Sequence, residues 1–294
     1  MTHAPSNAPP SSHPPVVIFG AGNMGSALLR GALAAGVLRP DRVAIADPYA
    51  ARRDAVAPLI AARFADAPAA ATWAREVASE SPVLWLLAVK PQKLADVRTA
   101  VAPHLPAQRG QLTILSILAG TPLARLRGAF PNASLIRSMP NLPAAIGQGC
   151  TAWCMDGGVS ADDPAPALAR GILAATSPVL VPLPDELFDA FTAVAGSGPA
   201  YVFLLAEAML KGALAAGLPA DQARGAIAQT IAGAAALLAR DPLTADPAAL
   251  RASVTSPGGT TRAALALLDQ HRVVDAFAEA ILAARDRGRE LARG

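Results

Sequence analysis

Short runs of hydrophobic residues alternate with helical periodicity between residues 16 and 182. The runs are rich in Val, Ile and Leu, and they predict strands at residues 16–20, 43–47, 83–89, 112–118, 134–139, 149–153 and 178–182. Helices are predicted from Met24 and over residues 50–62 and 163–175. This alternation is typical of a parallel sheet that helices cover on both faces, so the pattern predicts an α/β domain.

The pattern changes after Pro184. Between residues 185 and 291 only helical periodicity remains, with breaks at 196–199, 217–219, 241–247 and 256–259. Residues 1–15 hold five Pro and three Ser without an apolar stretch, which indicates a disordered tail and not a signal peptide. We therefore predict a tail at 1–15, an α/β Rossmann-type domain at 16–183 and an all-α domain at 184–294.

The predicted helices of the second half are apolar around most of their surface. Residues 226–239 are rich in Ala, and Gly225 and Gly233 lie eight residues apart, so neighbouring helices can approach closely. One domain of this size does not readily cover so broad an apolar surface. The pattern predicts a homo-oligomer whose contacts run through the helical half, with a self-contained monomeric bundle as the alternative.

Hydropathy and charge exclude several classes of protein. The mean hydropathy is +0.36, but much of it comes from Ala, and we find no uninterrupted apolar stretch of membrane-spanning length. The strongest candidate, residues 199–218, contains Glu207 and Lys211 at a spacing that forms an ion pair, so we expect a buried helix of a soluble protein. The net charge is +3 and the basic residues are scattered, which argues against a nucleic-acid surface.

Cysteine and histidine form no catalytic or metal-binding pattern. Cys150 and Cys154 fall in a predicted strand, which would hold them about 13 Å apart, too far for a disulfide. We expect both to pack as thiols. With no export signal and no cysteine pair, the expected compartment is the cytoplasm. The four His lie away from every motif, so we predict no metal site and no His-based relay.

A glycine-rich turn lies between the first predicted strand and helix. Gly20, Gly22 and Gly25, with Asn23 and Met24 between them, form the pattern G-x-G-x-x-G. The first two glycines allow a tight turn and close approach of a pyrophosphate, whose charge meets the free N–H groups of the helix N-terminus. This context predicts a dinucleotide site.

The end of the second strand bears on the choice of cofactor. Asp47 would accept a hydrogen bond from a ribose 2′-hydroxyl and repel a 2′-phosphate, which favours NADH. Arg52 and Arg53 follow in the next helix and could pair with that phosphate, which favours NADPH. The sequence leaves the choice open.

Three further segments could contact ligands. Ala88, Val89, Lys90 and Pro91 close a strand at the carboxyl edge of the predicted sheet, where ligands of such folds bind. Residues 195–201 and 255–261 each place Gly, Ser and Pro ahead of a helix, which suits a small anion and is also common in ordinary helix caps.

Five segments together resemble the pyrroline-5-carboxylate reductase family. They are GAGNMG (20–25), AVKPQ (88–92), IRSMPNLPAAIGQG (136–149), AGSGPAYVF (195–203) and VTSPGGTTRAALALLDQ (254–270). The resemblance runs from about Val16 to Leu291. It implies NAD(P)H-dependent reduction of 1-pyrroline-5-carboxylate to L-proline, the last step of proline biosynthesis. It also implies a dimer built through the helical domain, which commonly assembles further into a decamer.

The resemblance also implies roles for individual residues. Residues 20–25 would hold the pyrophosphate, residues 88–91 would lie on the nicotinamide side, and Asn141 would line the junction of cofactor and substrate. The substrate carboxylate would be seated by Ser256, Gly258, Gly259, Thr260 and Thr261. The Thr261 hydroxyl would bond the ring nitrogen and is the catalytic candidate. Ala195, Leu118 and Trp85 depart from the family pattern without removing a motif residue.

Two other functions are weighed against this one. A two-domain reductase acting on a hydroxy acid would need a helix-borne catalytic Lys, for which Lys211 is the candidate, and a related cyclic imine is a further substrate class. A nucleotide-binding regulator without turnover would have no need of a second anion seat. Side activity on other cyclic imines, feedback by proline and the size of the assembly are left open.

Overall fold

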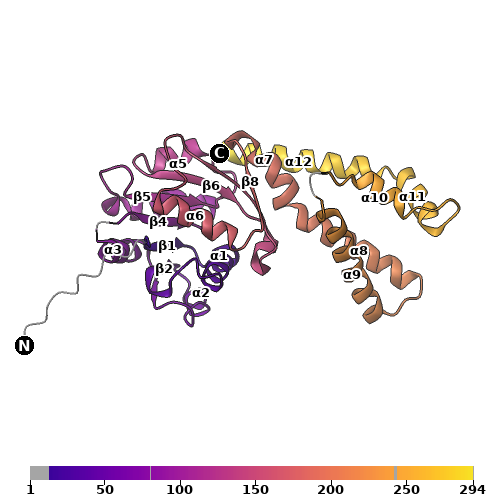
Figure 1. Ribbon diagram of the computed structural model, residues 1–294, viewed down its shortest axis with the longest axis horizontal. Helices are drawn as coiled ribbons and strands as arrows, with labels where there is room; N and C mark the ends of the chain where they lie inside the picture. The colour runs from indigo at the N-terminus through magenta and orange to yellow at the C-terminus, as the bar shows by residue number, and fades with distance from the viewer. Residues whose placement is uncertain (1–12, 80, 242–243, 294) are drawn as a thin grey trace, which may run out of the picture. The chain divides into compact units, whose positions relative to one another are not determined.

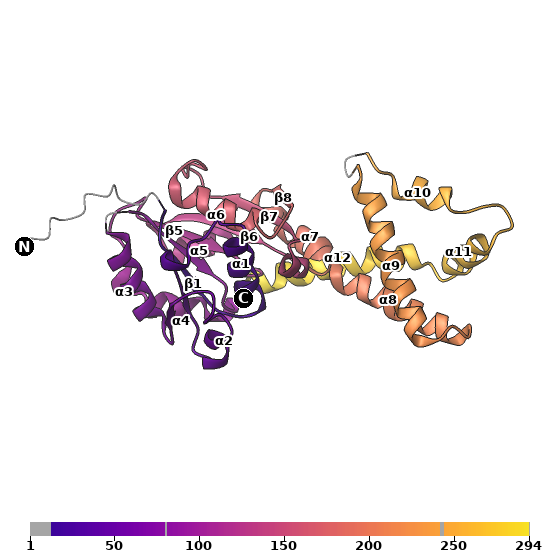
Figure 2. The ribbon, with the colours of Figure 1, turned by 60° about the horizontal axis from the view of Figure 1, so that its bottom comes forward.

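The computed structural model describes residues 13–79, 81–241 and 244–293 (Figures 1 and 2). Most of the predicted tail, residues 1–12, lies outside these described residues. The chain forms two compact units: Met1–Gly196 with Arg285–Gly294, and Ser197–Ala284. They are called the sheet unit and the helical unit below.

The sheet unit is built on eight strands in the order β3-β2-β1-β4-β5-β6-β7-β8. Every neighbouring pair is parallel except β6 and β7. The strands are β1 (Val16–Phe19), β2 (Val43–Ala46), β3 (Ala62–Phe64), β4 (Val83–Leu87), β5 (Leu112–Ser116), β6 (Ser134–Met139), β7 (Cys150–Met155) and β8 (Val179–Pro182). The strand order reverses between β1 and β4, and ligands of doubly wound folds bind at such a point. The predicted Rossmann-type fold is confirmed.

Helices cover both faces of this sheet (Figure 1). Val16 and Ile18 of β1 pack with α1 (Asn23–Ala34) and α6 (Pro164–Ala174). Val17 and Phe19 point to the other face, where the core includes α3 (Ala67–Ala78), α4 (Leu94–Ala100) and α5 (Leu123–Ala129). Because side chains alternate along a strand, a strand buried on both faces is a continuous apolar run, as the sequence shows.

Short helical turns complete the sheet unit. They are η1 (Pro40–Arg42), η2 (Pro91–Lys93), η3 (Ala102–His104), η4 (Leu142–Ile146) and η5 (Asp185–Leu187). The helix predicted over residues 50–62 is wrong in length: α2 is Ala50–Asp54, and residue 62 already begins β3. Pro58 lies between them and has no N–H to extend the helix.

The second half is helical, as predicted. It contains α7 (Phe188–Phe191), the π-helical turn η6 (Thr192–Gly196), α8 (Gly198–Ala215), α9 (Ala220–Ala239), α10 (Pro247–Ser253), α11 (Thr260–Gln270) and α12 (Val273–Arg293). Within the helical unit, α8 packs on α9, and Tyr201 meets Phe277 edge to face at 6.4 Å between ring centroids. At the break predicted for residues 196–199, a bend at Ser197 separates η6 from α8 within the mostly helical segment Asp185–Ala215.

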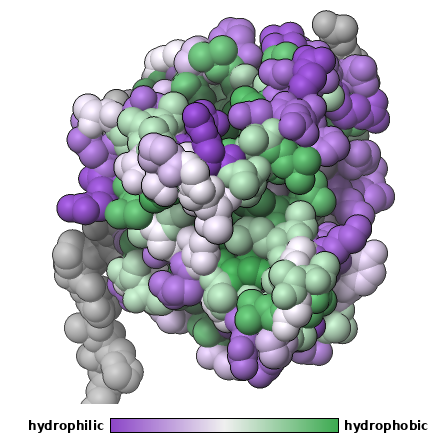
Figure 3. Space-filling view, turned by 90° about the vertical axis from the view of Figure 1, so that its right-hand side faces the viewer, coloured by the Kyte–Doolittle hydropathy of each residue, from purple (hydrophilic) through white to green (hydrophobic). Residues whose placement is uncertain are grey.

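The apolar surface of α8 is not covered within one chain. No residue of α8 is buried, and Phe203 and Leu204 are 60% and 59% exposed. Figure 3 shows apolar side chains gathered on the exposed surface between hydrophilic ones. The expectation of a buried helix at 199–218 is therefore wrong for the single chain, and the expected Glu207–Lys211 pair is absent from the ion pairs of the described residues. An apolar patch of this kind marks an interaction surface.

Segment Asp185–Ala215 is long and apolar enough to cross a membrane by length and composition, and only 6% of its most apolar window is buried. The same composition is expected of a helix that another protein surface covers. Length and hydropathy therefore do not distinguish a membrane-spanning helix from a helix at a protein interface.

Candidate active site

The glycine-rich turn follows β1 directly, at the point where the strand order reverses. Gly20 has a φ of +107°, and a Cβ there would lie 2.6 Å from the carbonyl oxygen of Ala88. A Cβ at Gly25 would lie 2.1 Å from the carbonyl oxygen of Gly20. These two positions need glycine because the turn packs tightly against the end of β4 and against itself.

Gly22 needs glycine for a different reason. Its φ is −69°, and a Cβ there would meet no atom within 4 Å, so the space in front of it is open. The backbone N–H groups of Asn23, Met24 and Gly25 have no acceptor among the described residues, because they form the first turn of α1. Open space beside free N–H groups at a helix N-terminus fits a dinucleotide pyrophosphate.

Asp47 is enclosed by the turn. Its side chain is 2% exposed, Oδ2 accepts from the N–H of Ala21 at 2.8 Å, and Oδ1 accepts from the N–H of Tyr49 at 2.9 Å. The sequence predicts that this carboxylate faces a ribose hydroxyl. In the structure both oxygens already bond backbone N–H groups, so Asp47 fixes the shape of the glycine-rich turn.

Two arginines surround the same strand end. Arg52 Nη1 lies 3.4 Å from Asp47 Oδ2, and its guanidinium lies 4.6 Å from the centroid of the Tyr49 ring. Arg53 donates to the carbonyl oxygen of Asp47 at 2.7 Å. The side chain of Arg52 is half exposed, so a positive charge stands beside the buried carboxylate and remains accessible.

The end of β4 lies against the glycine-rich turn. The N–H of Ala88 donates to the carbonyl oxygen of Phe19 at 2.8 Å, and Val89 follows beside Gly20. Lys90 is exposed, and Pro91 starts η2. The structure therefore brings Ala88 and Val89 to the turn, and the placement of residues 88–91 on the nicotinamide side stays a prediction.

Asn141 joins three segments of the sheet unit. Its Oδ1 accepts from the N–H of Cys150 at 2.9 Å, and its Nδ2 donates to the carbonyl oxygen of Ala195 at 3.1 Å. In a regular helix that carbonyl would accept from residue 199, but Pro199 has no N–H. The π-helical turn ends at Gly196, and Asn141 supplies the donor that Pro199 cannot.

The second predicted anion seat lies in the helical unit. Gly258 has a φ of +71°, and a Cβ at Gly259 would lie 2.5 Å from Ser256 Oγ. The helix α11 begins at Thr260, and the N–H groups of Thr260 and Thr261 have no acceptor among the described residues. Free N–H groups and hydroxyls at a helix start suit a carboxylate. Thr261 is half-buried.

Sequence reasoning missed one buried ion pair. Arg137 of β6 is 5% exposed, and its Nη1 lies 2.7 Å from Asp185 Oδ1. The other oxygen of Asp185 accepts from the N–H of Leu123, and the Arg137 guanidinium lies 4.3 Å from the centroid of the Phe188 ring. An Arg inside an apolar strand is the signal that could have pointed to this pair.

The thiols are as expected. Cys150 and Cys154 lie in β7 and are free. Burial and the nearby Asp185 carboxylate raise the pKa of Cys154 to about 12. Burial also raises the pKa of Cys150. Among the described residues no group of His, Cys, Asp or Glu is placed to hold a metal ion.

Two family models match the chain. Residues 185–291 match "Pyrroline-5-carboxylate reductase dimerisation", and residues 15–120 match "NADP oxidoreductase coenzyme F420-dependent". The first match covers the helical half of the chain, and the second covers the part of the sheet unit that contains the glycine-rich turn.

Relatives match over nearly the whole chain. A pyrroline-5-carboxylate reductase of Synechocystis is 38% identical over 94% of this chain and 97% of its own length. One of Pseudomonas aeruginosa is 35% identical over 96% and 98%. Among solved structures, a pyrroline-5-carboxylate reductase of Coxiella burnetii is 26% identical with a TM-score of 0.79, covering 94% of this chain and 98% of that one. The fold is also that of a Plasmodium falciparum pyrroline carboxylate reductase with NADP bound, at 22% identity and a TM-score of 0.78 over 95% and 98%.

Proposed function

The chain belongs to the pyrroline-5-carboxylate reductase family, and we propose that it reduces 1-pyrroline-5-carboxylate to L-proline with NAD(P)H, the last step of proline biosynthesis. The observation that carries this proposal is the similarity to the Synechocystis reductase, which spans both units over 94% of the chain. A regulator that only binds nucleotide would not need the intact second anion seat. A hydroxy-acid reductase would depend on Lys211, which is exposed on α8.

The cofactor is assigned to the carboxyl edge of the sheet. We propose that Gly20, Gly22, Asn23, Met24 and Gly25 hold the pyrophosphate, supported by the open space at Gly22 and the free N–H groups of α1. We place Ala88, Val89, Lys90, Pro91 and Asn141 on the nicotinamide side. Asp47 belongs to this site through its bond to the Ala21 N–H, which shapes the turn. When bound, the reduced nicotinamide supplies a hydride for the imine carbon.

The substrate is assigned to the start of α11. We propose that Ser256, Gly258, Gly259, Thr260 and Thr261 seat the carboxylate on backbone N–H groups and hydroxyls. The Thr261 Oγ1 accepts a hydrogen bond from the protonated ring nitrogen and holds the imine in one orientation. Because the imine arrives already protonated, no side-chain acid is needed. Fixed alignment of this kind can lower a barrier by roughly 7 kcal/mol or more.

We also propose how the chain assembles. The helical half matches a dimerisation family model, and the apolar side chains of α8 are exposed in one chain, so the chain oligomerises through this half. We propose a homodimer that assembles further into a decamer. Light scattering on purified protein tests this, since a decamer has ten times the chain mass of 29.8 kDa. A mass of one chain would contradict both parts.

We make three further proposals, on the domain boundary, the compartment and the partners. We propose a domain boundary at residues 183/184, supported by the family model that begins at residue 185; the division into compact units lies further on, between Gly196 and Ser197. We propose a cytoplasmic protein. The scattered basic residues support the absence of a nucleic-acid partner. An interface between subunits accounts for the exposed apolar surface of α8 without a membrane.

The activity is tested by following oxidation of NADPH and, separately, NADH in the presence of 1-pyrroline-5-carboxylate. The proposal predicts substrate-dependent oxidation with proline as the product, and the two rates give the cofactor preference. Cofactor binding without turnover would contradict it and would direct attention to other cyclic imines.

A further inference from the structure

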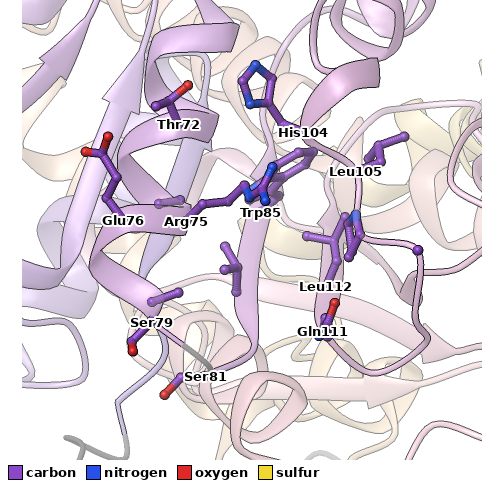
Figure 4. Close-up of a pocket in the computed structure, with 15 residues that line it drawn as sticks. Thr72, Arg75, Glu76, Ser79, Ser81, Trp85, His104, Leu105, Gln111 and Leu112 are labelled. Atoms are coloured by element: carbon purple, nitrogen blue, oxygen red, sulfur yellow. The ribbon is translucent and has the colours of Figure 1, made fainter.

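A cavity of about 650 Å³ lies at the amino edge of the sheet, away from the glycine-rich turn (Figure 4). Val83 and Leu112, which line it, are the first residues of β4 and β5. Gly20 and Ala88, by contrast, follow the last residues of β1 and β4. The cavity is therefore separate from the proposed cofactor site, and its volume suits a small molecule.

Trp85 of β4 forms part of the wall of this cavity and carries an unsatisfied polar group. The residue is 2% exposed, and its Nε1 is a buried side-chain nitrogen without a hydrogen-bond partner among the described residues. A buried N–H without an acceptor destabilises the fold by about 1–3 kcal/mol. Because Nε1 has no accessible surface, Trp85 offers a ligand in the cavity the face of its ring and not its N–H group.

The other residues that line the cavity provide both hydrogen-bond donors and apolar surface. Arg75 of α3, His104 at the end of η3 and Gln111 before β5 line the cavity together with Leu105 and Leu112. Figure 4 shows Arg75 directed toward the indole of Trp85. Glu76, the acidic residue among the described lining residues, is directed away from it.

We propose that this cavity binds a small organic anion that carries an apolar body. The Arg75 guanidinium pairs with the anionic group, and His104 and Gln111 of the same lining supply further donors. The apolar body packs on Leu105, Leu112 and the indole ring. A carboxylate and a phosphate monoester share this chemistry, and the site differs from the proposed carboxylate seat at α11 in lying on the sheet unit.

The site is tested by titration calorimetry on the full-length protein, saturated with NADPH. The probes are benzoate, phenyl phosphate and, as the neutral control, benzamide. The proposal predicts saturable binding of at least one anion, with benzamide about tenfold weaker or worse. The anion that binds more tightly identifies the preferred headgroup.

Variants assign the binding to the cavity. Arg75→Gln should weaken the anion about tenfold or more, whereas Arg170→Gln, an exposed arginine on α6, should leave it unchanged. Trp85→Phe should leave the affinity nearly unchanged, since the inaccessible N–H does not meet the ligand and an aromatic wall is kept. Circular dichroism checks that each variant is folded. Absence of saturable binding, equal affinity for benzamide, or equal affinity for Arg75→Gln and the wild type would overturn the proposal. Anion binding that is lost in Thr261→Ala and kept in Arg75→Gln would instead assign it to the substrate seat.

Discussion

Asn141 donates from Nδ2 to the carbonyl oxygen of Ala195 at 3.1 Å, where the following helical turn offers no N–H because residue 199 is proline. Its Oδ1 accepts from the N–H of Cys150 at 2.9 Å. Both ends of the amide are therefore engaged within the protein. Asn141 fixes the geometry just after the carboxyl end of β6.

Replacing Asn141 by Ala should lower the free energy of unfolding by about 1–3 kcal/mol, since two partly buried backbone groups lose their partners. Urea denaturation measures the change. Asn132→Ala is the matched control, because Asn132 is exposed and makes one bond, to the carbonyl oxygen of Ala107. Equal stability of the two variants would contradict the role assigned to Asn141.

Gly22→Val should abolish NAD(P)H binding without unfolding the protein. The space in front of Gly22 is open and its φ is negative, so the side chain fits the fold and fills the pyrophosphate approach. Gly25→Val should unfold the turn, because a Cβ there overlaps the carbonyl oxygen of Gly20. Thermal melts and cofactor titration of both variants separate the two effects. Unchanged cofactor affinity in Gly22→Val would place the pyrophosphate elsewhere.

Arg52→Ala should lower the ratio of kcat/KM with NADPH to kcat/KM with NADH. Its exposed guanidinium is the cation beside Asp47 that can pair with a 2′-phosphate, and loss of such a pair reduces affinity by about tenfold. Asp47→Asn should raise the same ratio, since it removes a negative charge. Its amide keeps an acceptor for only one of the two N–H groups, of Ala21 and Tyr49, so both cofactors should bind more weakly. If neither variant changes this ratio, the adenosine ribose does not lie at the end of β2.

Thr261→Ala should reduce turnover about tenfold or more, because the ring nitrogen loses its hydrogen-bond partner. Thr261→Ser keeps the hydroxyl and should retain most of the activity. Steady-state kinetics with both variants test the assignment. Wild-type kinetics in Thr261→Ala would remove this residue from the mechanism.

Cys154 should resist alkylation in the folded protein. Its pKa is raised to about 12, chiefly by burial, so at neutral pH the thiol stays protonated and unreactive. Iodoacetamide labelling followed by mass spectrometry should show modification of Cys154 only after denaturation. Rapid labelling of the native protein near neutral pH would mean that β7 is more open than the structure shows.

Hydrophobic patterning was sufficient to predict seven of the eight strands of the sheet unit, but it missed the short, half-buried β3 and the antiparallel pairing of β6 with β7. Strands such as Val16–Phe19 and Val83–Leu87 are buried on both faces and are therefore continuous apolar runs. The glycine-rich turn was predictable because its glycines are needed for close backbone approach, which requires that residue type.

Three features were not predictable from local pattern. The sequence G-S-G-P at residues 196–199 predicts the break, which is a bend at Ser197, but not the hydrogen bond that the distant Asn141 donates to Ala195 beside it. The position of Asp47 predicts a ligand contact, which stays a prediction, but not its hydrogen bonds from the N–H groups of Ala21 and Tyr49. Cover for α8 was expected from a second chain, with a self-contained bundle as the alternative, because apolar composition alone does not say which surface covers a helix.

The most direct test of the proposed reaction follows the hydride itself. The wild-type protein is supplied with 1-pyrroline-5-carboxylate and a reduced nicotinamide cofactor that carries deuterium at the transferring position, and the product is examined by mass spectrometry and NMR. Direct transfer predicts L-proline with a single deuterium on Cδ, the former imine carbon, and none on Cα. Oxidation of the cofactor without labelled proline would contradict the account.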